Sequence, residues 1–232
     1  LLAARNSGPA FGKLIYSPYQ TPPHILKIWK YLEKLERGEI KRLIITAPPR
    51  HGKSQTVTKI FPAWLLGRNP QIEVMIGSYA QSLASTFGRD IRNFMASDIY
   101  REIFPSAILS KDSKAKAEFS TISGGQLHAA GLDGSFTGKG AEVFILDDTI
   151  KNAKQARSET HKKSLRDFYD EVAETRLTPT GKVVAMHTRW AEDDLIGYLL
   201  SEKKEEGWTV LNMPAISKDD VPLWPEKFSL EL

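Results

Sequence analysis

The sequence has no cysteine. This absence excludes a disulfide-stabilised scaffold, a thiol nucleophile and a zinc site built on cysteine. The five histidines are scattered over 232 residues, and no two of them lie at the spacing of metal ligands. Long apolar runs are also missing, because stretches such as Val143–Leu146 are far shorter than the roughly 20 residues that a membrane helix needs. We therefore expect no membrane span, and we find no basic-then-apolar secretory leader.

The sequence has only a small excess of positive charge. Lysine and arginine number 32 against 28 acidic residues, which gives a formal net charge of +4. This balance is compatible with a polyanionic partner but is weak support for one. A length of 232 residues with 41% hydrophobic residues suits one large domain, or one domain with a small appendage. Because the chain starts without methionine and stops in what reads as a helix start, we expect it to be a piece of a longer protein.

Apolar runs alternate with helical patterns along the chain. The pattern predicts buried strands near 43–45, 72–78, 143–146 and 182–186. It predicts helices near 22–38, 53–66 (kinked at Pro62), 83–94, 158–176 and 192–206. Residues 1–21 read as mixed and turn-rich, and residues 105–141 as strand fragments and loops. The alternation indicates an α/β fold with a mostly parallel sheet flanked by helices.

A phosphate-binding loop is predicted at residues 47–54. The segment fits G-x-x-x-x-G-K-[ST], except that Ala47 replaces the first glycine. A buried strand precedes it and a helix follows, so backbone N–H groups and the helix N-terminus would face phosphate oxygens. Lys53 would reach the β- and γ-phosphates, Ser54 would offer its hydroxyl to Mg²⁺, and Arg50 would lie near the γ-phosphate. The alternative is an ordinary Pro/Gly turn that happens to contain Gly-Lys-Ser.

Two aspartates follow the predicted strand 143–146. Buried positions before Asp147 push it to the carboxyl edge of the sheet, where open α/β folds bind ligands. Asp147 is predicted to hold Mg²⁺ through water, and Asp148 to polarise the attacking water. Alone, an Asp-Asp pair often starts a turn, but together with the loop at 47–54 it predicts ATP or GTP hydrolysis.

Two further segments fit a nucleotide site. Gln20 lies upstream of the loop, and its amide can both donate to and accept from the adenine edge. Thr188 and Arg189 follow the predicted strand 182–186 and should emerge at the same sheet edge as Asp147, where Thr188 could sense the γ-phosphate. The predicted nucleotide-binding residues are Gln20, Pro49, Arg50, His51, Gly52, Lys53, Ser54 and Gln55.

A set of ordered segments carries a family resemblance over nearly the whole chain. They are "PYQTPPH", "GEIKRLIITAPPRHGKS", "FPAWLLGRNP", "SYAQSLA", "GKGAEVFILDD", "HTRWAEDDL" and "LWPEKFS". In this order and spacing the chain resembles the N-terminal ATPase domain of the large terminase subunit of tailed double-stranded DNA bacteriophages.

The resemblance implies an ASCE-type, RecA-like P-loop fold of three layers, with ATP and Mg²⁺ as cofactors. It implies a core at 1–190 and a small helical lid or linker region at 191–232, before a C-terminal nuclease domain that lies outside this chain. It implies a motor that moves double-stranded DNA into the procapsid as a homo-oligomeric ring, in the host cell cytoplasm at the portal vertex. The portal protein and the small terminase subunit are the implied partners, and the isolated domain is expected to be monomeric and to cut no DNA.

The resemblance also assigns roles. Gln20 falls in the adenine motif, residues 50–54 in Walker A, and Asp147 in Walker B. Asp148 matches the catalytic carboxylate, where many relatives have glutamate, and Thr188 with Arg189 matches the coupling motif. Relatives often have an arginine in the stretch where this chain has Lys139, so Lys139 is the expected cation supplied across a subunit interface. The predicted catalytic residues are Lys53, Asp148, Arg50 and Lys139, and the predicted metal ligands are Ser54 and Asp147.

Three alternatives remain at this point. A superfamily-2 helicase fragment shares the upstream glutamine and the acidic pair, but a helicase needs a second RecA-like domain. A small-molecule kinase would need an arginine-rich lid, which we do not find. A non-catalytic nucleic-acid-binding module with a degenerate P-loop would rely on the basic stretch 151–166, which we interpret instead as a solvated helix face.

Overall fold

A seven-stranded sheet forms the centre of the computed structural model, which describes all residues except 112–114, 137 and 230–232. The strands are β1 (Arg42–Thr46), β2 (Glu73–Ser78), β3 (Glu118–Ser120), β4 (Gln126–Gly131), β5 (Ala141–Asp147), β6 (Leu177–His187) and β7 (Thr209–Asn212). Their order is β3-β4-β2-β5-β6-β1-β7, and every neighbouring pair is parallel except β3 with β4. The predicted mostly parallel α/β sheet is confirmed.

Alternating side chains of the central strands divide the core into two layers. Leu43 and Ile45 pack into one apolar cluster, whereas Ile44 between them packs into the other. β5 repeats the pattern, with Ile145 in the first cluster and Phe144 in the second. Successive residues of a strand point to opposite faces, so a continuously apolar strand must be covered on both sides.

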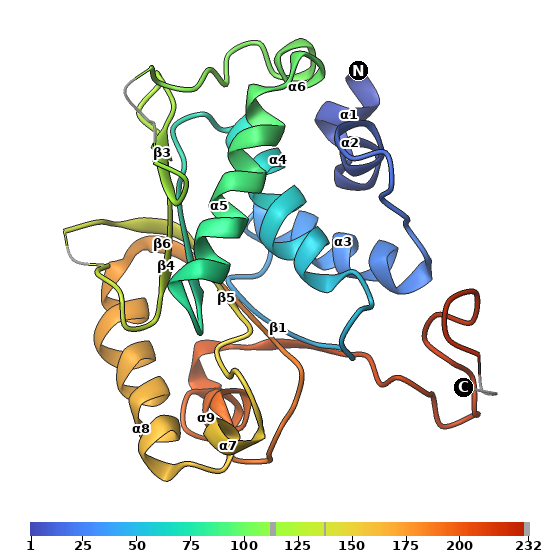
Figure 1. Cartoon of the computed structure of the whole chain (residues 1–232), viewed down its shortest axis with the longest axis vertical. Helices are drawn as coiled ribbons and strands as arrows, with labels where there is room; N and C mark the ends of the chain where they lie inside the picture. The colour runs from blue at the N-terminus through green and yellow to red at the C-terminus, as the bar shows by residue number, and fades with distance from the viewer. Residues whose placement is uncertain (112–114, 137, 230–232) are drawn as a thin grey trace.

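Helices supply the two covers. The larger cover consists of α1 (Leu2–Asn6), α2 (Gly8–Ile15), α3 (Pro23–Glu36), the π-helical segment η1 (Gln55–Ile60), α4 (Phe61–Arg68), α5 (Gln81–Ala96) and α6 (Asp98–Ile103). The opposite face carries α8 (Glu159–Phe168), η2 (Tyr169–Ala173) and α9 (Leu195–Ser201), with the short elements α7 (Ala153–Ala156), η3 (Glu174–Arg176) and η4 (Lys204–Glu206) in the same part of the chain. Figure 1 shows α8 and α9 on the side of the sheet away from α3 and α4. The result is a three-layer arrangement.

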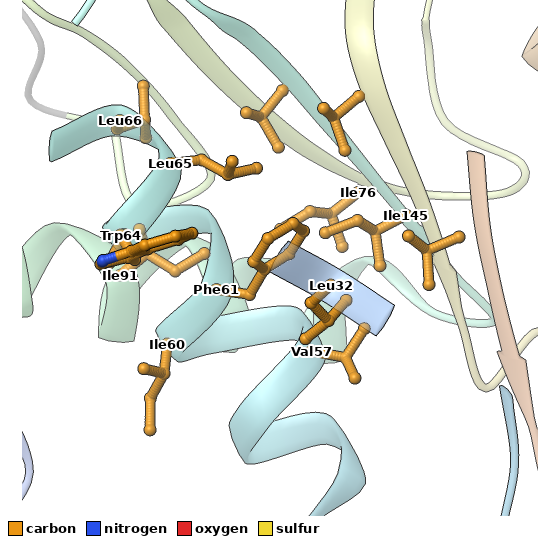
Figure 2. Packing of buried hydrophobic residues seen from close by; sticks show 14 of the residues in the cluster. Leu32, Val57, Ile60, Phe61, Trp64, Leu65, Leu66, Ile76, Ile91 and Ile145 are labelled. Carbon is orange, nitrogen blue, oxygen red and sulfur yellow. The ribbon is translucent and has the colours of Figure 1, made fainter. Parts of the chain in front are cut away.

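The helix after the predicted phosphate loop is built in two pieces. The chain runs through the π-helical turn η1 and continues as α4, with Pro62 in its first turn. Proline lacks a backbone N–H, so it is tolerated in the first turn of a new helix. Figure 2 shows Val57, Phe61 and Leu65 from these two pieces packed toward Ile76 and Ile145 of the sheet.

Three parts of the chain differ from the sequence expectations. Residues 1–21 contain two helices, because Gly8 and Gly12 let the chain lie directly on the rings of Trp29 and Tyr19. The helix expected over 192–206 is only α9 with a short 3-10 turn, although Gly207 does end it in a left-handed conformation. Strand β7 was not predicted, since this edge strand buries only Leu211 and has no clear apolar alternation.

The sheet order positions the candidate site. β6 lies between β1 and β5, so the carboxyl ends of these three parallel strands are adjacent. Residues that follow them in sequence must therefore meet at one edge. Separately, none of the helices in the described part of the chain is long and apolar enough to cross a membrane.

Replacement of Phe61 tests the larger core layer. Its ring is fully buried and meets Trp29 edge-on with ring centroids 6.1 Å apart. We expect Phe61→Ala to lower the free energy of unfolding by about 3–5 kcal/mol, because the deletion leaves a cavity in a packed layer. Urea denaturation measures the loss. Leu14→Ala, at a side chain that is 48% exposed, is the control and should change stability little; equal losses for both would contradict the packing described here.

Candidate active site

The loop after β1 turns sharply at two residues. Arg50 and Gly52 have φ angles of 63° and 78°, in the left-handed region. Glycine adopts this conformation freely, whereas arginine does so at a cost. Such turns present successive backbone N–H groups to a common point, which is the geometry of an anion-binding loop. The strain at Arg50 marks the loop as a functional element.

Lys53 is a buried cation without a carboxylate partner. Its side chain is 5% exposed, and it forms no ion pair among the described residues. Its ammonium donates to the Thr188 hydroxyl at 3.0 Å, and that hydroxyl donates to the Ala47 carbonyl at 3.4 Å. A buried charge normally needs a counter-charge. The arrangement therefore favours an anion at this position, beside the predicted coupling residue Thr188.

Asp147 lies at the end of β5, fully buried among hydroxyl groups. Ser54 Oγ donates to its Oδ1 at 3.3 Å, and Thr58 Oγ1 donates to its Oδ2 at 2.6 Å. Burial, reinforced by the nearby Asp148 charge, raises the pKa of Asp147 to about 7. Carboxylate and hydroxyl oxygens are the donors that Mg²⁺ prefers, so the pair Ser54 and Asp147 fits the predicted ion.

Asp148 is held by its backbone. Its φ of 46° is left-handed, its N–H donates to the Met186 carbonyl at 3.3 Å, and its carbonyl accepts from the Tyr79 N–H at 3.1 Å. Among the described residues, none hydrogen-bonds its carboxylate. The main chain is thus fixed between β2 and β6 while the carboxylate stays available.

His187 and Thr149 join the ends of β5 and β6. The His187 Nε2 and the Thr149 hydroxyl lie 3.0 Å apart, and both side chains are buried. Burial lowers the pKa of His187 to about 4, so the ring is neutral at pH 7. The sequence analysis assigned no role to either residue, nor to Thr58. Their positions in the sequence could have indicated them, because each of the three lies within four residues of a predicted site residue.

Arg189 does not face Lys53. Its Nε forms an ion pair with the buried Asp194 at 3.0 Å, and its Nη2 donates to the carbonyls of Ala191 and Glu192, both at 3.0 Å. Asp194 also caps α9 by accepting from the Gly197 N–H at 3.1 Å. Arg189 therefore shapes the loop between β6 and α9, and the adjoining Thr188 alone contacts the phosphate-loop lysine.

A chain of hydroxyl groups ties the Gln20 side of the site to the loop. Trp29 Nε1 donates to the Tyr19 hydroxyl at 2.8 Å, and that hydroxyl lies 2.8 Å from Thr56 Oγ1. Thr56 in turn donates to the Gly52 carbonyl at 3.0 Å. The exposed Gln20 follows directly and lines a cavity of about 570 Å³. The cavity is also lined by Tyr16, Pro18, Tyr19, Ile25, Arg50, Gly52, Gln55, Trp224, Glu226 and Lys227.

Two further predicted residues lie outside this group. His51 turns away from the cavity, stacked on Phe228 with ring centroids 4.5 Å apart, and its Nδ1 lies 2.9 Å from the carbonyl of Pro49. Lys139 pairs with Glu118 of β3 at 2.6 Å. β3 lies at the edge of the sheet beside β4, and β4 is four strand spacings, or roughly 19 Å, from β1. The phosphate loop follows β1, so Lys139 does not reach the loop of its own chain.

The raised pKa of Asp147 predicts a pH-dependent stability difference. Asp147 ionises near 3.8 in the unfolded chain and near 7 in the folded one, so its ionisation destabilises the fold as pH rises from 4 to 8. Asp147→Asn has no such proton to lose. We expect its free energy of unfolding, relative to wild type, to rise by up to about 4 kcal/mol over this range, because each unit between the two pKa values is worth about 1.4 kcal/mol.

Urea denaturation at pH 4, 6 and 8 measures this difference. Asp219→Asn, at an exposed position, is the control and should show no pH-dependent gain. A relative stability of Asp147→Asn that stays flat or falls with pH would show that Asp147 is not the buried, hard-to-ionise carboxyl described here.

Known proteins with similar sequences are phage terminases. Residues 44–227 match the family described as terminase large subunit, T4likevirus-type, N-terminal. The chain is 26% identical over 189 residues to the large terminase subunit of Enterobacteria phage T3, covering 78% of this chain and 31% of that protein. The chain thus spans about a third of this curated relative.

Solved structures show the same fold. The large terminase of bacteriophage HK97 superimposes with a TM-score of 0.58 at 12% identity, over 94% of this chain and 45% of that one. The yeast protein Dbp5, solved with Nup159, Gle1, inositol hexakisphosphate and ADP, superimposes with a TM-score of 0.52 at 12% identity, over 91% of this chain and 52% of its own. The family match spans most of the sequence and includes the loop, both aspartates and Thr188, so the chain belongs to the family of N-terminal domains of phage large terminase subunits.

Proposed function

We propose that this domain is the Mg-dependent ATPase motor of a DNA-packaging terminase. The observation that carries the proposal is the buried Lys53 ammonium, which has no carboxylate partner among the described residues, at the sheet edge where Asp147, Asp148 and Thr188 meet. A triphosphate supplies the missing negative charge. Phosphoryl transfer depends mostly on positioning and charge stabilisation, and these residues provide both.

Each residue has a separate role in the proposed hydrolysis. Lys53 neutralises the β- and γ-phosphates, and the loop N–H groups hold them. Asp148 orients the attacking water and accepts its proton, while Thr188 redirects to the γ-phosphate the hydrogen bond that its hydroxyl donates to the Ala47 carbonyl. Gln20 reads the adenine edge. Ser54 and Asp147 would hold Mg²⁺, which when bound neutralises phosphate charge.

The proposed partners follow from the family. They are double-stranded DNA, the portal protein and the small terminase subunit, with the domain acting as a homo-oligomeric ring at the portal vertex in the host cytoplasm. The motor region proper is proposed to span 1–190, with 191–232 leading to the nuclease domain of the longer protein. We also propose that this domain by itself cuts no DNA.

The basic stretch 151–166 gives little support to a purely DNA-binding module. Lys162 is buried against Glu159 and Asp193 at 2.9 and 2.5 Å, and Lys163 lies 3.7 Å from Asp167. These pairs neutralise two of the six lysine and arginine residues of the stretch, so a DNA-binding module remains the alternative. A non-catalytic module would show no ATP turnover, which the next experiment measures.

Asp148→Asn separates binding from hydrolysis. The substitution keeps the shape of the side chain but removes the carboxylate, while Asp147 remains for the metal. We expect near-normal affinity for Mg-ATP with turnover reduced by at least about 10², the scale of general-base catalysis. Lys53→Ala is the reference variant and should abolish turnover by removing the phosphate charge. Equal loss of binding and turnover in Asp148→Asn would make Asp148 a metal ligand or a structural residue.

Lys139 is proposed as the cation that completes a neighbour's site. It lies too far from its own loop, and cations supplied from outside raise phosphoryl-transfer rates by about 10³–10⁵. We expect Lys53→Ala and Lys139→Ala subunits to be inactive alone and to regain activity when mixed, since an intact Lys139 then faces an intact loop. ATPase assays at increasing protein concentration provide the readout. If the mixture hydrolyses no ATP while Lys139→Ala alone is fully active, Lys139 is not the cation supplied to the neighbour. Arg89, Arg92 and Arg101 are then the residues to test.

A further inference from the structure

The segment 222–228 packs against the phosphate loop, far from it in sequence. The Phe228 ring stacks on His51 at an interplanar angle of 18°, and the buried Trp224 ring lies 5.2 Å from His24 at the start of α3. Lys227 Nζ donates to the Arg50 carbonyl at 3.3 Å. In Figure 1 the red C-terminal segment leaves the sheet after β7 and runs to the side on which α2 and α3 lie.

This segment forms one wall of the 570 Å³ cavity. Tyr16 and Gln20 also line it, and Gly52 with Gln55 lines the part that belongs to the phosphate loop. The volume falls within the range of small-ligand sites. Because it joins the adenine-reading Gln20 to the loop, the cavity is where the nucleoside end of a nucleotide would lie.

The two cations of the cavity are Arg50 and Lys227. The Lys227 ammonium lies 4.7 Å from the centroid of the Trp224 ring and 5.7 Å from that of Phe228. Cation–π contacts of this kind hold the charge in place without neutralising it. No ion pair of Lys227 occurs among the described residues, and an ammonium has three donors, of which the Arg50 carbonyl takes one.

We propose that Lys227 is a nucleotide-binding residue that contacts the phosphate nearest the ribose. The inference rests on the proposed function and extends the site to the C-terminal segment. A bound nucleoside polyphosphate passes from Gln20 to the loop between the two cations, and its α-phosphate lies beside Gln55 and Gly52. Lys227 then donates to that phosphate while its stem stays on Trp224.

Binding of ADP and of adenosine to the full chain tests the proposal. Lys227→Met keeps the stem and removes the charge, and Lys218→Met is the matched control at an exposed lysine of the same C-terminal region. We expect Lys227→Met to weaken ADP binding by roughly 5-fold, the scale of a partly exposed charge contact, and to leave adenosine binding unchanged. Lys227→Arg should keep most of the ADP affinity, and the difference should shrink in high salt.

Three outcomes overturn the proposal, and they are distinguishable. Unchanged ADP affinity in Lys227→Met shows that the lysine makes no contact with the phosphate. Equal weakening for ADP and adenosine shows that Lys227 only shapes the cavity wall. Wild-type protein that binds neither ligand removes the proposed ATPase function itself, and the inference falls with it.

Discussion

The ammonium of Lys53 is the group on which the site depends. It is buried at the carboxyl edge of the sheet, and the hydrogen bond that it forms with another described residue goes to the neutral hydroxyl of Thr188. A desolvated cation costs free energy unless an anion compensates it. The nearby Asp147 could compensate, but its own burial favours the protonated form. In the proposed function, a phosphate would compensate the charge of Lys53, and a divalent cation would favour the ionised form of Asp147.

Hydrogen bonds of hydroxyl groups connect the strands and helices that carry the site residues. Thr58 and Ser54, one helical turn apart, fix the two oxygens of Asp147. Thr149 bridges to His187 across β5 and β6. Thr56 links Tyr19 to the Gly52 carbonyl. Hydroxyls can donate and accept at once, so they satisfy buried polar atoms without adding charge to this edge of the sheet.

Sequence patterns predicted the sheet and the residues at its edge because both follow from short-range rules. Buried apolar runs identified β1, β2, β5 and β6, and polar residues directly after them had to meet once the strands were parallel. The other elements could not be predicted, because they depend on contacts between residues that are far apart in the sequence. The N-terminal helices depend on glycines lying against Trp29 and Tyr19, β7 depends on the edge of β1, and the contact of Lys227 with Arg50 joins segments 177 residues apart. None of these contacts produces a pattern in the neighbouring sequence from which it could be predicted.

Contacts with the C-terminal segment hold the loop after β1 in its left-handed backbone conformation. Left-handed residues other than glycine cost about 1–3 kcal/mol unless their surroundings hold them. Asp148 tolerates the conformation as an aspartate and is held by Tyr79 and Met186. Arg50 has no such tolerance, and its carbonyl is held by Lys227, while its neighbour His51 is held by Phe228 and His24. Contacts with residues 224–228 therefore help to hold the left-handed turn of the loop at residues 47–54.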